Sequence, residues 1–166
     1  MAHGSAGTFN VNLPLSGSPG IECRSGGAAN GNFTMVFTFS QTLTNVDSVG
    51  VIGTASGASG NIDSIDAHNY IVNLTGVGNA QMITVTLNNV TDSAGDNSSS
   101  VSATMGVLLG DTTANGQVNS SDIAQTQSES GQPVTSSNFR EDVTVNGLIN
   151  SSDVALVQAQ SGTALP

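Results

Sequence analysis

Oxygen-bearing side chains recur at a regular spacing in two copies near the C-terminal end of the chain. With Asp111 and Asp142 as position 1, each copy places such side chains at positions 1, 3, 5, 9 and 12 and glycine at position 6. This is the layout of a calcium-binding loop, in which the glycine permits a sharp turn and the position 7 carbonyl also contributes. The predicted calcium ligands are Asp111, Thr113, Asn115, Gln117, Asn119, Asp122, Asp142, Thr144, Asn146, Leu148, Asn150 and Asp153.

A single cluster of these residue types would be consistent with an ordinary turn, because Asp, Asn, Thr and Gly all favour turns. Two copies in register are much harder to explain in that way, and the repeat also continues past the loops. The residues that recur at the same offset are Ala124 and Ala155, Gln127 and Gln158, Ser130 and Ser161, and Gly131 and Gly162. Repetition at a fixed period indicates a repeated structural unit. The sequence therefore predicts two calcium sites, and coincidental turns are the alternative.

The two EF-hand-type loops, each running through Asn-Ser-Ser-Asp straight into a helix, resemble the dockerin module of bacterial extracellular proteins. The resemblance covers residues 109–166. It implies calcium as the cofactor, a cohesin-like protein domain as the partner, and recognition through serines at the two helix starts: Ser120, Ser121, Ser151 and Ser152. Because the two serine pairs are identical, they would permit binding in either of two orientations. Threonine at position 3 and asparagine at position 5 depart from the usual pattern and leave each loop only two carboxylates.

Residues 6–108 show the alternation of apolar and polar side chains that is typical of strands with one buried face. In residues 32–39 the apolar side chains at every second position are Phe33, Met35, Phe37 and Phe39. Other strands are expected at residues 9–13, 21–23, 49–52, 70–74, 83–87 and 101–105, with turn clusters at 56–60 and 92–96. This pattern predicts a mainly β fold, an immunoglobulin-like antiparallel sandwich. Residues 70–95 also resemble the closing strands of bacterial immunoglobulin-like domains, a likeness of fold rather than function.

The boundary between the two predicted domains, residues 6–108 and 109–166, leaves almost no linker, so we expect them to pack together. Asn119 or Ser120 is suited to cap the first helix, with Asp122 near its positive end. Gly131 and Gly162 occupy expected C-cap positions. A small core is predicted to contain Val118, Ile123, Phe139, Ile149, Val154 and Val157.

Composition excludes several partners. Twelve acidic residues stand against two basic ones, Arg24 and Arg140, which gives a formal net charge of −10. Such a surface repels nucleic acid and anionic membranes and offers no basic patch for phosphates. No apolar run is long enough to span a membrane. We expect neither a nucleic-acid partner nor membrane insertion.

Little else in the sequence suggests chemistry. Residues 1–5 read as a cloning remnant, so a native signal peptide would not be visible and His3 would take no part in a site. His68, beside Asp66, is interpreted as a solvated turn residue, and Cys23 as a small buried residue without a disulfide partner. Asp63 and Asp66 are read as turn formers. Asp92 and Asp96 flank a glycine turn, where a third calcium is a minor alternative.

These observations favour a non-enzymatic, calcium-binding accessory region at the C-terminal end of a larger surface or secreted protein. Loops with two carboxylates function only where calcium is millimolar, so the location is extracellular or on the cell surface. The alternative is cohesin-type docking through residues 109–166. Carbohydrate binding is less favoured, because the chain has no tryptophan and one tyrosine on which a sugar could stack.

Overall fold

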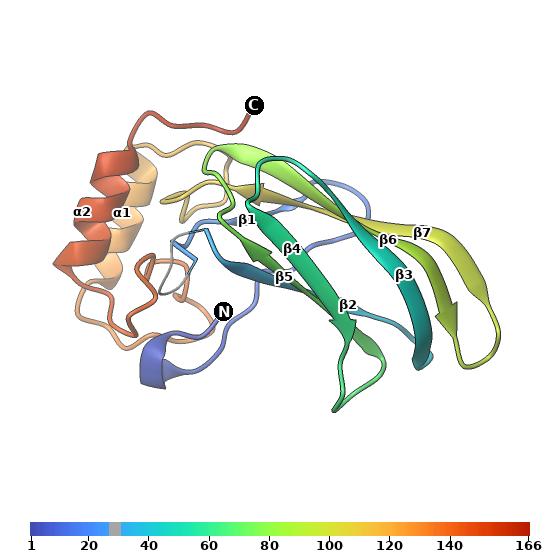
Figure 1. The fold of residues 1–166 in the computed structure, drawn as a ribbon. Helices are drawn as coiled ribbons and strands as arrows, with labels where there is room; N and C mark the ends of the chain where they lie inside the picture. Colours follow the sequence, from blue (N-terminus) through green and yellow to red (C-terminus); the bar gives the residue numbers. More distant parts are fainter. Residues whose placement is uncertain (27–30) are drawn as a thin grey trace.

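The computed structural model describes residues 1–26 and 31–166. Within these residues the molecule is mainly β, with two sheets and a pair of α-helices. The helices lie side by side at one end of the two sheets, and the N-terminal turn, which contains the short 3-10 helix Gly4–Ala6, lies below them (Figure 1). The predicted fold class is therefore confirmed at the level of a mainly β protein followed by two helices.

The larger sheet has four strands in the order β1-β7-β6-β3. These strands are β1 (Gly20–Glu22), β3 (Leu43–Ile52), β6 (Gln81–Asp92) and β7 (Asn97–Val107). The three long strands pair antiparallel, whereas the short β1 pairs parallel with the end of β7. This parallel pairing brings residues 20–25 to the same end of the sheet as the start of the C-terminal region.

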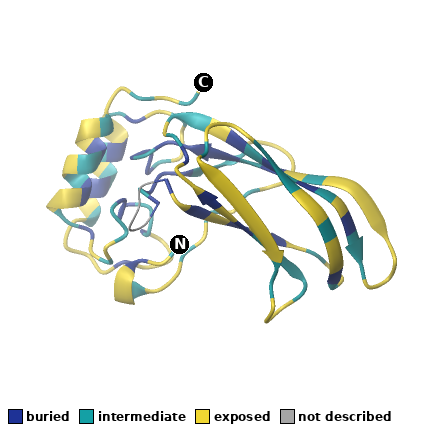
Figure 2. Ribbon diagram, viewed as in Figure 1, coloured by how far each residue is buried: buried dark blue, intermediate teal, exposed yellow. Residues whose placement is uncertain are grey.

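The smaller sheet has three strands in the order β2-β5-β4. They are β2 (Phe33–Thr38), β4 (Gly57–Ile62) and β5 (Asn69–Thr75), all antiparallel. The predicted alternation holds in β2, where Phe33, Met35 and Phe37 are buried and the residues between them are exposed. These side chains meet Val85 and Met105 of the other sheet in one apolar cluster. Figure 2 shows buried residues within the strands of both sheets, whereas the edge strand β4 is exposed along most of its length.

One strand prediction and one turn prediction were wrong. Residues 9–13 form no strand, because their backbone is held by other groups: the carbonyl of Phe9 accepts hydrogen bonds from the Met1 amino group and from Arg24. Residues 56–60, expected to be a turn, belong largely to β4. This edge strand forms by backbone pairing with β5 and not by side-chain burial, and Gly60 leaves room for the ring of Tyr70, which would lie 2.6 Å from an added Cβ.

The two helices are α1 (Ser120–Glu129) and α2 (Ser151–Gln160). The N-cap predicted at Asn119 is confirmed, whereas the C-caps are Ser130 and Ser161, one residue before the glycines that were predicted there. Asn119 and Asn150 are the N-caps, and Gly131 and Gly162 follow the helix ends with positive φ. The apolar cluster beneath them consists of Leu108, Val118, Val143 and Val157. In the part of the chain that the structure describes, neither helix is long and apolar enough to cross a bilayer.

Candidate calcium loops and the junction beside them

Position 1 of each loop is a fully buried aspartate held by backbone N–H groups. The two carboxylate oxygens of Asp111 accept from Asn115 N at 3.0 Å and Gly116 N at 2.8 Å. Asp142 accepts from the N–H groups at the same positions of the second loop, at 3.1 and 2.8 Å. Two N–H donors stabilise an ionised carboxylate, which is the form that binds a cation.

Position 12 closes each loop onto position 3. One oxygen of Asp122 accepts from the amide and the hydroxyl of Thr113, at 3.0 and 2.9 Å, and the other accepts from Asn119 N at 2.9 Å. Asp153 repeats all three bonds at the same distances. The Thr113 hydroxyl also lies 3.5 Å from Asp111, so it stands between the two carboxylates of its loop.

The backbone of each loop turns through left-handed conformations at positions 4 and 6. Gly116 and Gly147, at position 6, have φ of +85° and +88°. Ala114 and Val145, at position 4, have φ of +58° and +53°, which is unusual for residues with a side chain. The same two positions depart from ordinary backbone in both copies, so the repeat predicted from sequence is also a repeat of conformation.

The carbonyls at position 7 are the remaining predicted ligands. Gln117 and Leu148 form isolated bridges with Ala164 and Pro133, respectively. In the first bridge the hydrogen bonds belong to the flanking residues, from Val118 N to Thr163 O and from Leu165 N to Gly116 O. No donor among the described residues pairs with the carbonyl of Gln117 or Leu148. These two oxygens therefore keep their lone pairs for another ligand.

The donor set of each loop suits a hard cation. Two carboxylates, a hydroxyl, amide oxygens and a backbone carbonyl provide oxygen only, which is the chemistry calcium requires. Within residues 1–26 and 31–166 no three His, Cys, Asp or Glu side chains gather in one place, so oxygens of other residue types would have to complete each shell. The residues present fit calcium, and the Thr113 hydroxyl can offer its oxygen by turning its proton away from the carboxylates.

In the first loop, burial disfavours the charged form of the Asp111 carboxyl. The pKa of Asp111 is raised above its usual value chiefly by desolvation and also by the charge of Asp122, while the N–H bonds from Gly116 and Asn115 oppose that shift. Two buried carboxylates that share one small volume repel each other unless a proton or a cation lies between them. A divalent cation would relieve this repulsion directly.

The four serines named for partner binding lie in the first turn of each helix and are exposed: Ser120, Ser121, Ser151 and Ser152. Asn119 and Asn150 orient these turns by accepting from the N–H groups of Ser121 and Ser152, both at 2.8 Å. The two serine pairs are therefore exposed at equivalent places on the two helices.

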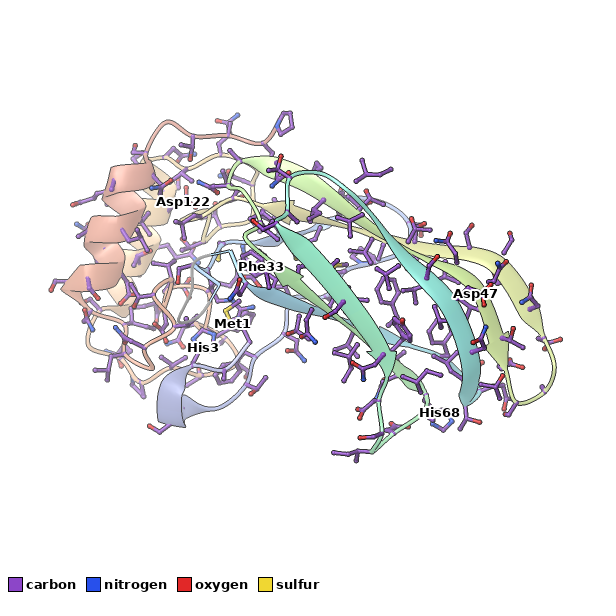
Figure 3. The ribbon with its side chains drawn as sticks, in the orientation of Figure 1. Met1, His3, Phe33, Asp47, His68 and Asp122 are labelled. Atoms are coloured by element: carbon purple, nitrogen blue, oxygen red, sulfur yellow. The ribbon has the colours of Figure 1, made fainter. Side chains whose placement is uncertain are left out.

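His3 contradicts our expectation that it takes no part in a site. It is completely buried, and its Nδ1 lies 2.8 Å from Oδ2 of Asp142 at position 1 of the second loop. Its Nε2 lies 2.8 Å from Nη1 of Arg24, which in turn forms a paired contact with Glu22. Phe9 and Phe139 enclose the imidazole, with ring centroids at 5.4 and 6.2 Å. Figure 3 shows His3 beside the C-terminal loops, far from the exposed His68.

Phe139 was predicted to anchor the small C-terminal core, and this is wrong. Its ring stacks on Phe9 at 5.6 Å and lies 5.0 Å from the guanidinium of Arg24. It belongs to the junction between the N-terminal segment, β1 and the second loop. These contacts of the Phe139 ring are therefore with the N-terminal segment and Arg24.

Arg140 holds the first loop to β1 from the other side. Its guanidinium donates to the carbonyls of Asp111 at 2.7 Å, Thr112 at 2.8 Å and Ile21 at 2.9 Å. Cys23 donates from its thiol to the carbonyl of Arg140 at 3.5 Å, and Ser25 N donates to Val143 O. The expected packing of the two parts of the chain is therefore confirmed by these contacts.

The other candidates remain isolated. His68 Nδ1 lies 2.8 Å from the exposed Asp66, which orders the turn before β5. Asp92 accepts from the amides of Ala94 and Asp96 and shapes the turn between β6 and β7. Burial raises the pKa of Cys23 to about 12, so its thiol stays protonated.

Comparison of the chain with protein-family models, with curated proteins and with solved structures gave no match. The dockerin-like reading therefore depends on the loops themselves. His3, Glu22 and Arg24 were not predicted from the sequence to lie beside a loop. One signal was available: among twelve acids, the two arginines of the chain are the groups most strongly expected to form buried pairs.

Proposed function

We propose that this chain is a non-enzymatic, calcium-binding accessory region of a larger secreted or cell-surface protein. In this role two calcium ions stabilise a C-terminal pair of helices that packs on a β-domain of immunoglobulin-like type. The observation that carries the proposal is the repetition of the loops bond for bond, with buried aspartates at positions 1 and 12 and oxygen donors between them. Such loops bind weakly, in the range useful outside cells.

The experiment is calorimetric titration of the chain with calcium. We expect two sites with dissociation constants on the order of 10⁻⁵ to 10⁻³ M, because each loop has only two carboxylates. Asp122→Ala and Asp153→Ala should each remove one site, since no neighbouring carboxylate replaces position 12. Asp63→Ala, which changes a turn acid away from the loops, should leave both. No binding up to about 10 mM calcium would refute the proposal.

Docking to a cohesin-like domain is the second candidate. It is favoured by the exposure of the two identical serine pairs at the helix starts. The test is capture of purified cohesin domains in calcium, with Ser120 and Ser151 changed singly and together to a bulky residue. Binding in two orientations predicts that each single change is tolerated and that the double change abolishes capture. Carbohydrate binding has less support, since Tyr70 is buried within the core.

A further inference from the structure

We propose that the two loops are unequal and that His3 is a positioning residue for the second one, so that this loop binds calcium more tightly than the first. The inference rests on the proposed calcium binding and adds an order of occupancy to it. Its basis is the buried contact between His3 and Asp142, for which the first loop has no counterpart among the described residues.

The hydrogen bonds determine where the proton of the imidazole lies. A guanidinium has only donors, so Nε2 of His3 must accept from Nη1 of Arg24. The neutral ring then carries its proton on Nδ1 and donates it to Asp142 Oδ2. Gly147 N donates to the same Oδ2, and Asn146 N donates to Oδ1. Both carboxylate oxygens of Asp142 are thus held by donors before any cation arrives.

The charges around His3 balance. Nε and Nη2 of Arg24 donate to the two carboxylate oxygens of Glu22, at 2.7 and 2.6 Å. The guanidinium is therefore neutralised by Glu22, and the imidazole between Arg24 and Asp142 is itself neutral. No net positive charge from this group opposes a cation in the second loop.

The N-terminal turn also covers the second loop directly. A Cβ added to Gly4 would lie 2.8 Å from the carbonyl oxygen of Asn146, and one added to Gly147 would lie 2.8 Å from that of His3. The equivalent glycine of the first loop, Gly116, has nothing within 4 Å. The second loop is thus packed against protein where the first faces solvent, which restricts the movement of its ligands.

The first loop has a different neighbour. Arg140 donates to the carbonyl oxygens of Asp111 and Thr112, and within the described part of the chain it forms no ion pair. The positive charge of this guanidinium acts on the Asp111 carboxylate, and a positive charge close to position 1 repels a divalent cation. This contact lowers the affinity of the first loop while the neutral His3 contact supports the second.

Groups that orient a metal ligand typically change affinity by about 10- to 100-fold when they are removed. The effect is reciprocal: whatever factor the docked N-terminal turn adds to calcium affinity, calcium adds to docking of the turn. Calcium in the second loop should therefore hold residues 1–9 in place, whereas calcium in the first should not.

The test uses calorimetric titration of the full chain with calcium in two backgrounds. Asp122→Ala leaves the second loop, and Asp153→Ala leaves the first. His3→Ala should weaken the second loop about tenfold and leave the first within about twofold. His3→Asn, whose amide can reach the same carboxylate, should restore part of the loss. His68→Ala is the matched control, because that histidine is exposed and remote.

Equal effects of His3→Ala in both backgrounds, or none in either, would overturn the inference while leaving calcium binding intact. Absence of binding in the unaltered chain would instead refute the proposed function and this inference with it. If His3→Ala fails to fold, amide exchange of His3 and Phe9 at saturating calcium decides. Both amides are hydrogen-bonded, and faster exchange is expected in Asp153→Ala but not in Asp122→Ala. Equal exchange in the two variants would contradict the proposal.

Discussion

Val145 has a left-handed backbone, although it is β-branched and half-buried. The left-handed region costs a residue with a side chain about 1–2 kcal/mol, whereas glycine enters it freely at an entropic cost of roughly 0.5–1 kcal/mol. The strain persists because the hydrogen bonds on both sides of position 4 fix the turn: Thr144 N and Asn146 N both donate to loop carboxylates. At this position the loop geometry overrides the preference of the residue.

We therefore predict that Val145→Gly leaves the free energy of unfolding unchanged or raises it by up to about 1 kcal/mol. Chemical denaturation in calcium-containing buffer is the measurement. Ala114→Gly in the first loop is the matched variant and should behave in the same way. A loss of more than about 1 kcal/mol in both would mean that the left-handed conformation at position 4 is not the conformation in solution.

Glu141 is a buried carboxyl immediately before the second loop. Its Oε1 accepts from Gln125, but its Oε2 has no hydrogen-bond partner among the described residues. Burial raises its pKa above the ordinary value. A group whose pKa is raised by folding favours the folded state at pH values below its unfolded pKa, and that contribution is lost as the pH rises through the folded value.

Glu141→Gln should accordingly stabilise the chain at neutral pH by about 1–3 kcal/mol, because the amide carries no charge to desolvate. The gain should disappear below the ordinary pKa of 4.5, where the glutamate is protonated in both states. Denaturation curves of the two proteins from acidic to neutral pH, in chelator, provide the comparison. A difference that is constant across this range would show that the carboxyl does not titrate with folding.

Among the elements, β2 carries the clearest burial pattern. Phe37 is 7% exposed and faces the other sheet, whereas Thr38 beside it points outward. Phe37→Ala should reduce the free energy of unfolding by about 3–5 kcal/mol, as large-to-small changes in a core do. Thr38→Ala should change it by less than about 0.5 kcal/mol. Thermal or chemical unfolding of both variants tests the prediction, and similar small effects would mean that β2 does not contribute to the core.

Local patterns were predictable and long-range contacts were not. The helix starts followed from Asn119 and Asn150, because a cap and its capping box lie within a few residues of each other. In contrast, β4 forms only through its partner β5, and nothing in its Gly- and Ser-rich sequence alternates. The approach of His3 to Asp142 joins opposite ends of the chain, which no spacing rule anticipates.

At the scale of the whole molecule, positive charge is concentrated at one place. Arg24 and Arg140 are the only lysine or arginine residues in the chain, and both lie at the junction of β1 with the loops. Among the described residues, exposed acids such as Asp47 and Asp96 form no ion pair with either arginine. Positive charge is therefore confined to the junction, and the exterior remains anionic.

The C-terminal region depends on more than its own core. Its apolar cluster is small, and a segment of this size buries too little surface to be secure alone. A ligand that binds only the folded form adds about 1.4 kcal/mol per site when its concentration exceeds the dissociation constant tenfold. Two calcium ions would then contribute roughly 3 kcal/mol, a large share of the stability of such a unit. We expect the sheets, whose buried residues form one continuous cluster, to need no such support.

Amide hydrogen exchange with and without chelator tests the central claim most directly. We predict that removal of calcium lowers the protection of the amides in α1 and α2, while those in the central strands β5 and β6 keep theirs. Calorimetric titration under the same conditions shows whether calcium is bound at all. Equal protection of both helices in the two conditions would contradict the account, because the loops would then hold the helices through their own hydrogen bonds without the metal.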